Sequence, residues 1–146
     1  MSSVVLAATA VIGAITGTSV IGVAINRRSG VLRVPKSTTS TVVLQDTSEL
    51  ALSKTGPTVV HFSAAWCGPC ATVRRVVDQV CADLSDVAHV EIDIDASPVA
   101  AKRMSVLSLP TTLIFDADGR QRYRTAGVPQ AADLRAALAP LLAHLP

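Results

Sequence analysis

Apolar residues follow two different periods between residues 41 and 146. Short apolar or β-branched runs alternate there with stretches in which apolar residues recur every three or four positions. The short runs are typical of strands, and the longer spacing is typical of amphipathic helices. Strands are expected at residues 41–44, 58–63, 87–94, 111–115 and 121–125, and helices at 47–53, 69–84, 97–104 and 134–142. This order predicts an α/β fold with helices on both faces of a mixed sheet.

Local signals indicate where these elements begin and end. Asp46 followed by Glu49 resembles a capping box, and Ser97-Pro98 puts a polar N-cap before a proline at the first helical position. Residues 116–119, Asp-Ala-Asp-Gly, are typical of a hairpin turn. Pro140 lies inside the last helix and is expected to kink or shorten it.

The N-terminal stretch from Val4 to Ile25 contains no charged residue and would be apolar on every side of a helix. At about 1.5 Å per residue it extends roughly 33 Å, enough to cross a hydrocarbon core of about 30 Å. We therefore expect one transmembrane helix, with residues 1–26 as anchor, 27–40 as a basic and polar linker, and 41–146 as the folded domain. The alternatives are a cleaved signal peptide and a buried helix of a soluble protein.

Positive charge follows the apolar stretch directly. The segment after it has no acidic residue and carries Arg27, Arg28, Arg33 and Lys36. A basic segment beside an apolar span indicates a membrane surface rather than nucleic acid. Because basic flanks favour the cytoplasmic side, we expect a single-pass cell-membrane protein with its domain in the cytoplasm. Residues 13–17 have the G-x-x-x-G spacing through which two such helices can form a homodimer.

The candidate chemistry lies in the sequence Trp66-Cys67-Gly68-Pro69-Cys70, between a predicted buried strand and a predicted helix. Unpaired N–H groups at a helix start stabilise a thiolate, so Cys67 is expected to be the nucleophile. Cys70 lies one turn later and can attack the mixed disulfide that Cys67 forms. Gly68 is expected to permit close approach, Pro69 to stiffen the loop, and Trp66 to shield the thiol.

A pair of cysteines at this spacing can also form half of a zinc site. A structural zinc ion needs about four ligands. The remaining cysteine and the three histidines form no second closely spaced pair, and three cysteines are too few for a disulfide framework. Redox chemistry without a bound metal is therefore expected.

The Trp-Cys-Gly-Pro-Cys sequence after an apolar strand resembles the signature of the thioredoxin family. The resemblance covers roughly residues 41–145 and implies the thioredoxin fold, a central mixed β-sheet flanked by helices. Leu109-Pro110-Thr111 is similar to the family's cis-proline segment, which implies a cis Pro110 and a Leu109 backbone that pairs with an extended substrate. Gly127 falls at the family's spacing and would let the substrate approach closely. An excess of Arg over Lys is typical of GC-rich bacteria such as actinobacteria.

The resemblance also implies an activity. It implies a protein-disulfide reductase that binds no cofactor and works through a Cys67–Cys70 disulfide, which an NADPH-dependent thioredoxin reductase reduces again. The expected function is therefore reduction of protein disulfides by a domain tethered to the cytoplasmic face of the membrane. The alternatives are an extracytoplasmic oxidoreductase for cytochrome maturation or disulfide repair, and a binding module without catalysis.

The chain departs from the thioredoxin pattern at the residues that help to deprotonate the second cysteine in that family. Thioredoxins usually have a buried Asp six residues before the first Cys, paired with a Lys on the next strand, and here these positions hold His61 and Glu91. Two alternatives follow from this difference. A His61–Glu91 pair transfers the proton of Cys70, or His61 is a neutral structural residue and the proton moves through water.

The other titratable candidates are expected to be structural. Cys81 lies on the apolar face of its helix and is expected to be a small buried side chain rather than a regulatory thiol. His89 and His144 have no clustered partners and are expected at the surface. Asp93 and Asp95 share one face of a strand, where a solvated strand end is favoured over a metal site.

Overall fold

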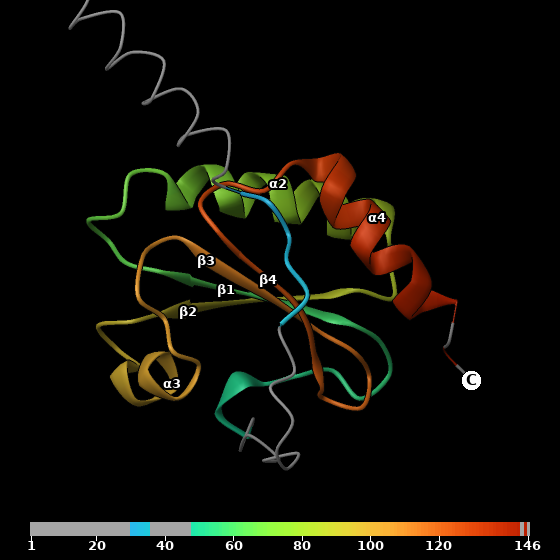
Figure 1. The fold of residues 1–146 in the computed structure, drawn as a ribbon, viewed down its shortest axis with the longest axis horizontal. Helices are drawn as coiled ribbons and strands as arrows, with labels where there is room; N and C mark the ends of the chain where they lie inside the picture. The colour runs from blue at the N-terminus through green and yellow to red at the C-terminus, as the bar shows by residue number, and fades with distance from the viewer. Residues whose placement is uncertain (1–29, 36–47, 144, 146) are drawn as a thin grey trace, which may run out of the picture.

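The computed structural model describes residues 30–35, 48–143 and 145 of the 146-residue chain. Its elements alternate between helix and strand as far as the final hairpin and helix (Figure 1). In chain order they are η1 (Ser48–Leu50), β1 (Thr58–Ser63), α2 (Cys70–Asp83), β2 (Ala88–Asp93), α3 (Pro98–Arg103), β3 (Thr111–Phe115), β4 (Gln121–Ala126) and α4 (Ala131–Leu142).

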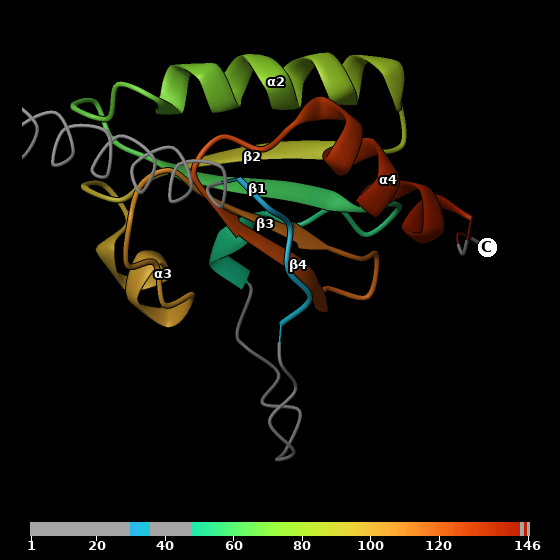
Figure 2. The ribbon, with the colours of Figure 1, turned by 45° about the horizontal axis from the view of Figure 1, so that its top comes forward.

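The described strands form one mixed sheet in the order β2-β1-β3-β4. β1 runs parallel to β2 and antiparallel to β3, and β3 runs antiparallel to β4. Helices α2 and α4 cover one face of the sheet, and α3 lies on the other face (Figure 2). The predicted architecture, a mixed sheet flanked by helices on both faces, is therefore confirmed.

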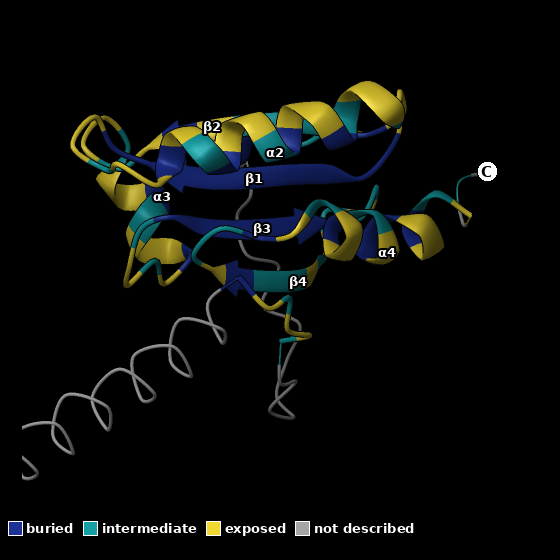
Figure 3. Ribbon diagram, turned by 90° about the horizontal axis from the view of Figure 1, so that it is seen from above, coloured by how far each residue is buried: buried dark blue, intermediate teal, exposed yellow. Residues whose placement is uncertain are grey.

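Strand β1 is buried on both sides, and its alternate side chains enter two apolar cores (Figure 3). Val59 points towards α2 and α4, where it packs in a cluster with Val73, Val77 and Leu138. Val60 and Phe62 point towards α3 and join a second cluster. The period of two in a strand produces this division. It also aims His61 and Ser63, which alternate with Phe62, at the α2 side of the sheet.

One predicted helix is much shorter than expected, and one predicted cap lacks its hydrogen bond. The helix expected at residues 47–53 is a single 3₁₀ turn, Ser48–Leu50, and Ala51 after it has a positive φ of 50°, which no helix can continue through. Ser97 does occupy the N-cap position of α3, with Pro98 at the helix start, but its side chain makes no capping hydrogen bond. The predicted strand 41–44 and Asp46 of the expected capping box lie outside the described residues.

The remaining predicted elements are present with small shifts of their ends. α4 passes through Pro140, which cannot donate to the carbonyl of residue 136, and ends two residues later at Leu142. The hairpin between β3 and β4 closes through Gly119, whose φ of 76° fits the predicted turn.

Residues 30–35, which fall in the segment expected to be a linker, lie along the outer edge of β4. Arg33 and Arg124 exchange two backbone hydrogen bonds of 2.8 and 2.9 Å, and the Gly30 amide donates to the Ala126 carbonyl at 2.6 Å. Leu32 packs against the apolar cluster beneath α2 and α4. This segment is therefore attached to the domain by both backbone bonds and apolar contact.

Within the described parts of the chain, no helix is long and apolar enough to cross a membrane. The apolar stretch that predicts the anchor, together with Arg27 and Arg28, lies outside these parts.

We predict that Gly30→Ala destabilises the domain. Gly30 has a φ of 85°, and a Cβ there would lie 2.1 Å from the Val128 carbonyl oxygen. The unfavourable backbone conformation alone should lower the free energy of unfolding by about 1–2 kcal/mol in a urea titration. Hydrogen exchange of the Arg124 amide should also accelerate, because that amide donates to Arg33.

Gly68→Ala is the matched control, because a Cβ at Gly68 would meet nothing within 4 Å. Its free energy of unfolding should stay within about 0.5 kcal/mol of the parent. Equal stability of Gly30→Ala and Gly68→Ala would contradict the attachment of residues 30–35 to β4.

Candidate active site

A disulfide joins Cys67 and Cys70 where the chain leaves β1 and enters α2. Cys67 lies in the connecting loop and is partly exposed, whereas Cys70 is the first residue of α2 and only 2 % exposed. The N-terminal end of α2, which carries partial positive charge, therefore begins at the disulfide. Cys67 is therefore the more accessible of the two cysteines to a partner molecule.

Backbone hydrogen bonds hold the loop around Cys67, and its outer side at Gly68 is open. The Cys67 amide donates to the Ala64 carbonyl at 3.0 Å, and the Cys70 amide donates to the Cys67 carbonyl at 3.2 Å. Space around Gly68 is open to an approaching molecule. The indole N–H of Trp66 donates to a carboxylate oxygen of Asp95 at 3.1 Å, and the Trp66 side chain is 70 % exposed. Trp66 thus presents a fixed apolar surface beside the disulfide.

The sheet register brings the cis-proline segment to the same end of the sheet. Phe62, near the end of β1, pairs with Thr111 at the start of β3, and Thr111 pairs with Ala126 at the end of β4. The peptide bond between Leu109 and Pro110 is cis, as predicted. Next to it, the Gly127 amide donates to the Pro110 carbonyl at 2.9 Å. Gly127 has a φ of 86°, a conformation that disfavours any residue with a side chain.

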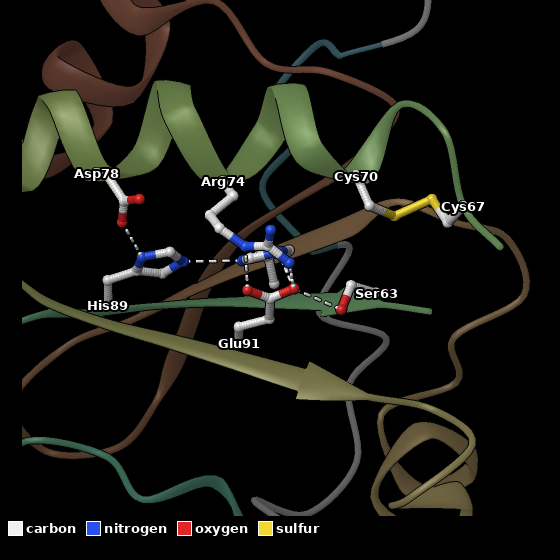
Figure 4. Close-up of polar contacts among 8 residues, drawn as sticks. Ser63, Cys67, Cys70, Arg74, Asp78, His89 and Glu91 are labelled. Carbon is white, nitrogen blue, oxygen red and sulfur yellow. Dashed lines mark hydrogen bonds and ion pairs between the residues drawn. A yellow bond between two sulfur atoms is a disulfide. The ribbon is translucent and has the colours of Figure 1, made fainter. Parts of the chain in front are cut away.

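Polar side chains fill the space beneath one edge of α2, beside the apolar core. They come from three elements: His61 and Ser63 from β1, His89 and Glu91 from β2, and Arg74 and Asp78 from α2 (Figure 4). On α2, Arg74 and Asp78 follow Cys70 at intervals of four residues, which puts them on one face of the helix. We call these side chains the polar strip.

Glu91 is held in its charged form within the polar strip. Both its oxygens accept hydrogen bonds from the Arg74 guanidinium, and Ser63 Oγ donates to Oε1 at 2.7 Å. The hydrogen bonds from Arg74 are the largest cause that lowers the pKa of Glu91, to about 2, against the opposing effect of burial. Glu91 is therefore a carboxylate at neutral pH.

His61 is fully buried in the same strip and neutral at neutral pH. Burial is the largest cause that lowers its pKa, to about 4, although the nearby Glu91 carboxylate opposes the shift. Its Nδ1 lies 2.8 Å from His89 Nε2. Its Nε2 lies 3.4 Å from Glu91 Oε1, too long for a good hydrogen bond, and has no hydrogen-bond partner among the described residues. The predicted proximity of His61 and Glu91 is therefore confirmed, and the distance leaves Nε2 available.

The prediction for His89 was wrong. Its side chain is only 15 % exposed, its Nδ1 lies 2.7 Å from an Asp78 oxygen, and its ring centroid lies 5.0 Å from that of His61, with the two ring planes inclined by 25°. The signal was present in the sequence, because His89 alternates with Val90 and so shares the strand face of Glu91. The predicted position of His144 lies outside the described residues.

The other candidates behave as structural residues. Cys81 packs against the apolar core, and burial is the main cause that raises its pKa, to about 11, so it stays a thiol. Asp93 accepts a hydrogen bond from the Asp95 amide, and Asp95 holds Trp66. In the parts of the chain that the structure describes, no group of three or more His, Cys, Asp or Glu residues could hold a metal ion.

The chain is similar to known thioredoxins in sequence. The Thioredoxin family model matches residues 40–140. The thioredoxin of Mycolicibacterium smegmatis is 38% identical over 79 residues, which covers 52% of this chain and 70% of that protein. The thioredoxin of Mycobacterium tuberculosis is 33% identical over 95 residues, covering 64% of this chain and 81% of the relative.

Solved structures agree with the sequence comparison. A mutant thioredoxin from Halobacterium salinarum has a TM-score of 0.57 at 28% identity, covering 73% of this chain and 89% of that one. Chloroplastic thioredoxin z has a TM-score of 0.56 at 28% identity, covering 72% and 92% respectively. With Cys67 and Cys70 joined at the start of α2, these matches show that the chain belongs to the thioredoxin family of thiol–disulfide oxidoreductases.

Proposed function

We propose that this protein reduces disulfides of other proteins, with Cys67 as nucleophile and Cys70 as the cysteine that completes the exchange. The supporting observation is the unequal exposure of the two cysteines, because Cys67 is the more accessible to a substrate disulfide. The Cys67 thiolate attacks one substrate sulfur, and the other leaves as a thiolate that takes up a proton. Cys70 then attacks Cys67, which forms the disulfide seen here and releases the reduced substrate.

The substrate is proposed to bind as an extended segment across Trp66, Gly68, Pro69, Leu109, Pro110 and Gly127. These residues lie at one end of the sheet, where Gly68 leaves open space and Trp66 is exposed. The Leu109 backbone would pair with the substrate segment as an added strand. An NADPH-dependent thioredoxin reductase is the proposed electron donor, as in the family to which the chain belongs.

His61 is the third proposed catalytic residue. It is neutral, it lies on the α2 side of β1 two residues from Ser63, and its Nε2 has no hydrogen-bond partner in the described parts of the chain. A neutral imidazole with an unpaired nitrogen can accept a proton. We assign it this role during the attack by Cys70, in preference to a purely structural role.

We further propose that the protein is tethered to the cell membrane with its domain in the cytoplasm. The proposal rests on the charge-free stretch Val4–Ile25 and on the basic residues that follow it. Residues 13–17 would allow pairing of two anchors. An extracytoplasmic oxidoreductase is the competing assignment, and it requires the opposite orientation.

Replacement of the two active-site cysteines should give different results. Cys67→Ser should abolish reduction of insulin by NADPH and thioredoxin reductase, because no nucleophile remains in reach. Cys70→Ser should accumulate a mixed disulfide with the substrate, detected by mass spectrometry, because the second attack is lost.

Cys81→Ser is the matched control, since it removes a thiol that is outside the loop and protonated. It should keep insulin reduction within about twofold of the parent, an effect below 0.5 kcal/mol. Normal turnover by Cys67→Ser would overturn the proposed function.

The orientation predicts a labelling pattern in intact cells. A cysteine added at the N-terminus should react with a membrane-impermeant maleimide, and one added at the C-terminus should react only after the cells are opened. The reverse pattern would favour the extracytoplasmic alternative. Release of the whole protein by a carbonate wash would contradict the anchor itself.

A further inference from the structure

Asp78, His89 and His61 form a continuous hydrogen-bonded chain from the surface to the interior (Figure 4). The Asp78 side chain is 58 % exposed, that of His89 is 15 % exposed, and that of His61 is fully buried. The contacts of 2.7 and 2.8 Å leave one hydrogen for each gap. This chain goes beyond the His61–Glu91 pair that the sequence suggests.

Hydrogen-bond counting assigns the protons of this chain when each ring carries one hydrogen. The Asp78 carboxylate can only accept, so His89 Nδ1 must donate to it. With one hydrogen on each ring, His89 Nε2 carries the lone pair, and His61 Nδ1 donates to it. The remaining nitrogen, His61 Nε2, carries no hydrogen, which agrees with its lack of a hydrogen-bond partner among the described residues.

This arrangement can take up a proton at one end and pass charge to the other. A proton that arrives on His61 Nε2 makes an imidazolium, which Glu91 Oε1 stabilises from 3.4 Å. His61 can then give its Nδ1 proton to His89 Nε2, which moves the positive charge next to Asp78. Because burial keeps the pKa of His61 near 4, His61 passes a proton on rather than keeping it.

The inner end of the chain lies beside Glu91, which also accepts a hydrogen bond from Ser63. Ser63 Oγ donates to Glu91 Oε1, the same oxygen that lies nearest to His61 Nε2. Figure 4 shows Ser63 on the side of Glu91 that faces the start of α2. The hydroxyl of Ser63 can accept one proton while it donates another.

We propose that Asp78, His89 and His61 form a proton relay that carries the proton of the Cys70 thiol from beneath α2 to the surface. The proposal rests on the proposed reductase function, and it makes His89 and Asp78 positioning residues that act through His61. It concerns the second step of the reaction, in which Cys70 must become a thiolate.

The step balances as follows for the mixed disulfide between Cys67 and the substrate. The S–H bond of Cys70 breaks, its sulfur bonds to Cys67, and the substrate sulfur leaves with the electron pair of the broken S–S bond. His61 takes up a proton at Nε2 on the inner side, and His89 releases one to solvent beside Asp78. When the disulfide is reduced again, the relay runs in reverse and returns a proton to Cys70.

Within residues 48–143, the charged and titratable groups around His61 come from two elements. Glu91 and His89 approach it from β2, and Arg74 and Asp78 from α2. Its partner on β3 is Thr112, which is uncharged. Arg74 is bonded to Glu91 and stays charged, so protons enter or leave this group of residues through the histidines.

The test is the pH dependence of a single turnover of the full-length protein. The reduced protein is mixed with a peptide disulfide, and the fluorescence of Trp66, the single tryptophan, reports formation of the Cys67–Cys70 disulfide. Asp78→Asn and His89→Phe should slow the second step about tenfold or more at pH 7. The rates should approach that of the parent at alkaline pH, where Cys70 ionises without help.

Asp83→Asn is the matched control, because it removes the same charge from the same helix at a residue paired with Arg135. It should change neither the rate nor its pH dependence by more than about twofold. A loss in Asp78→Asn that is equal at all pH values, or no loss relative to Asp83→Asn, would overturn the relay.

A second measurement reads the protons directly. Long-range ¹H–¹⁵N spectra of the reduced protein at pH 7 should show His61 and His89 protonated at Nδ1 only, and Asp78→Asn should perturb both rings. Protonation of His61 at Nε2 would overturn the relay even if turnover is normal. Failure of the parent protein to reduce insulin would instead overturn the proposed function, and the spectra would still report on the relay.

Discussion

The burial of β1 on both faces is the constraint on which the site depends. β1 lies between β2 and β3, and each of its residues is enclosed by the sheet and by helices above and below. The chain can therefore turn only after Ser63, where β1 reaches the end of the sheet, and the turn delivers Cys67 to the surface and Cys70 to the start of α2. The cis-proline segment and Gly127 reach the same end because their strands are registered on β1 and β3.

The same burial means that a polar side chain on β1 lowers the stability of the fold unless it has a hydrogen-bond partner. Burial keeps His61 neutral at neutral pH although Glu91 lies 3.4 Å from its Nε2, and His89 supplies its hydrogen bond. Arg74 neutralises Glu91 from the solvent side, so that a carboxylate is tolerated beside the apolar core. His61 thus stands where thioredoxins usually have an acid, and Glu91 on the neighbouring strand stands where they usually have a base.

The parts of the site that depend on local sequence could be predicted, and those that depend on register could not. Cys67, Cys70 and the cis bond before Pro110 follow from short motifs whose spacing fixes their geometry. The chain formed by His89 and Asp78 needs the pairing of β1 with β2 and the rotation of α2 above them, which no single segment encodes. Likewise, residues 30–35 fall in a segment expected to be a linker, and their contact with β4 depends on the exposed backbone of that strand and on the packing of Leu32.

The pairing of Arg33 with Arg124 has a consequence for self-association. A strand at the border of a sheet offers unpaired amides and carbonyls to any other extended chain, and many proteins protect such borders against aggregation. Here the protein's own preceding segment occupies that position, and the Arg124 guanidinium is turned inward to the carbonyl of Met104. Removal of residues 30–35 would leave the backbone amides and carbonyls along the edge of β4 without partners. A truncated domain should therefore associate through β4 more readily than the longer chain.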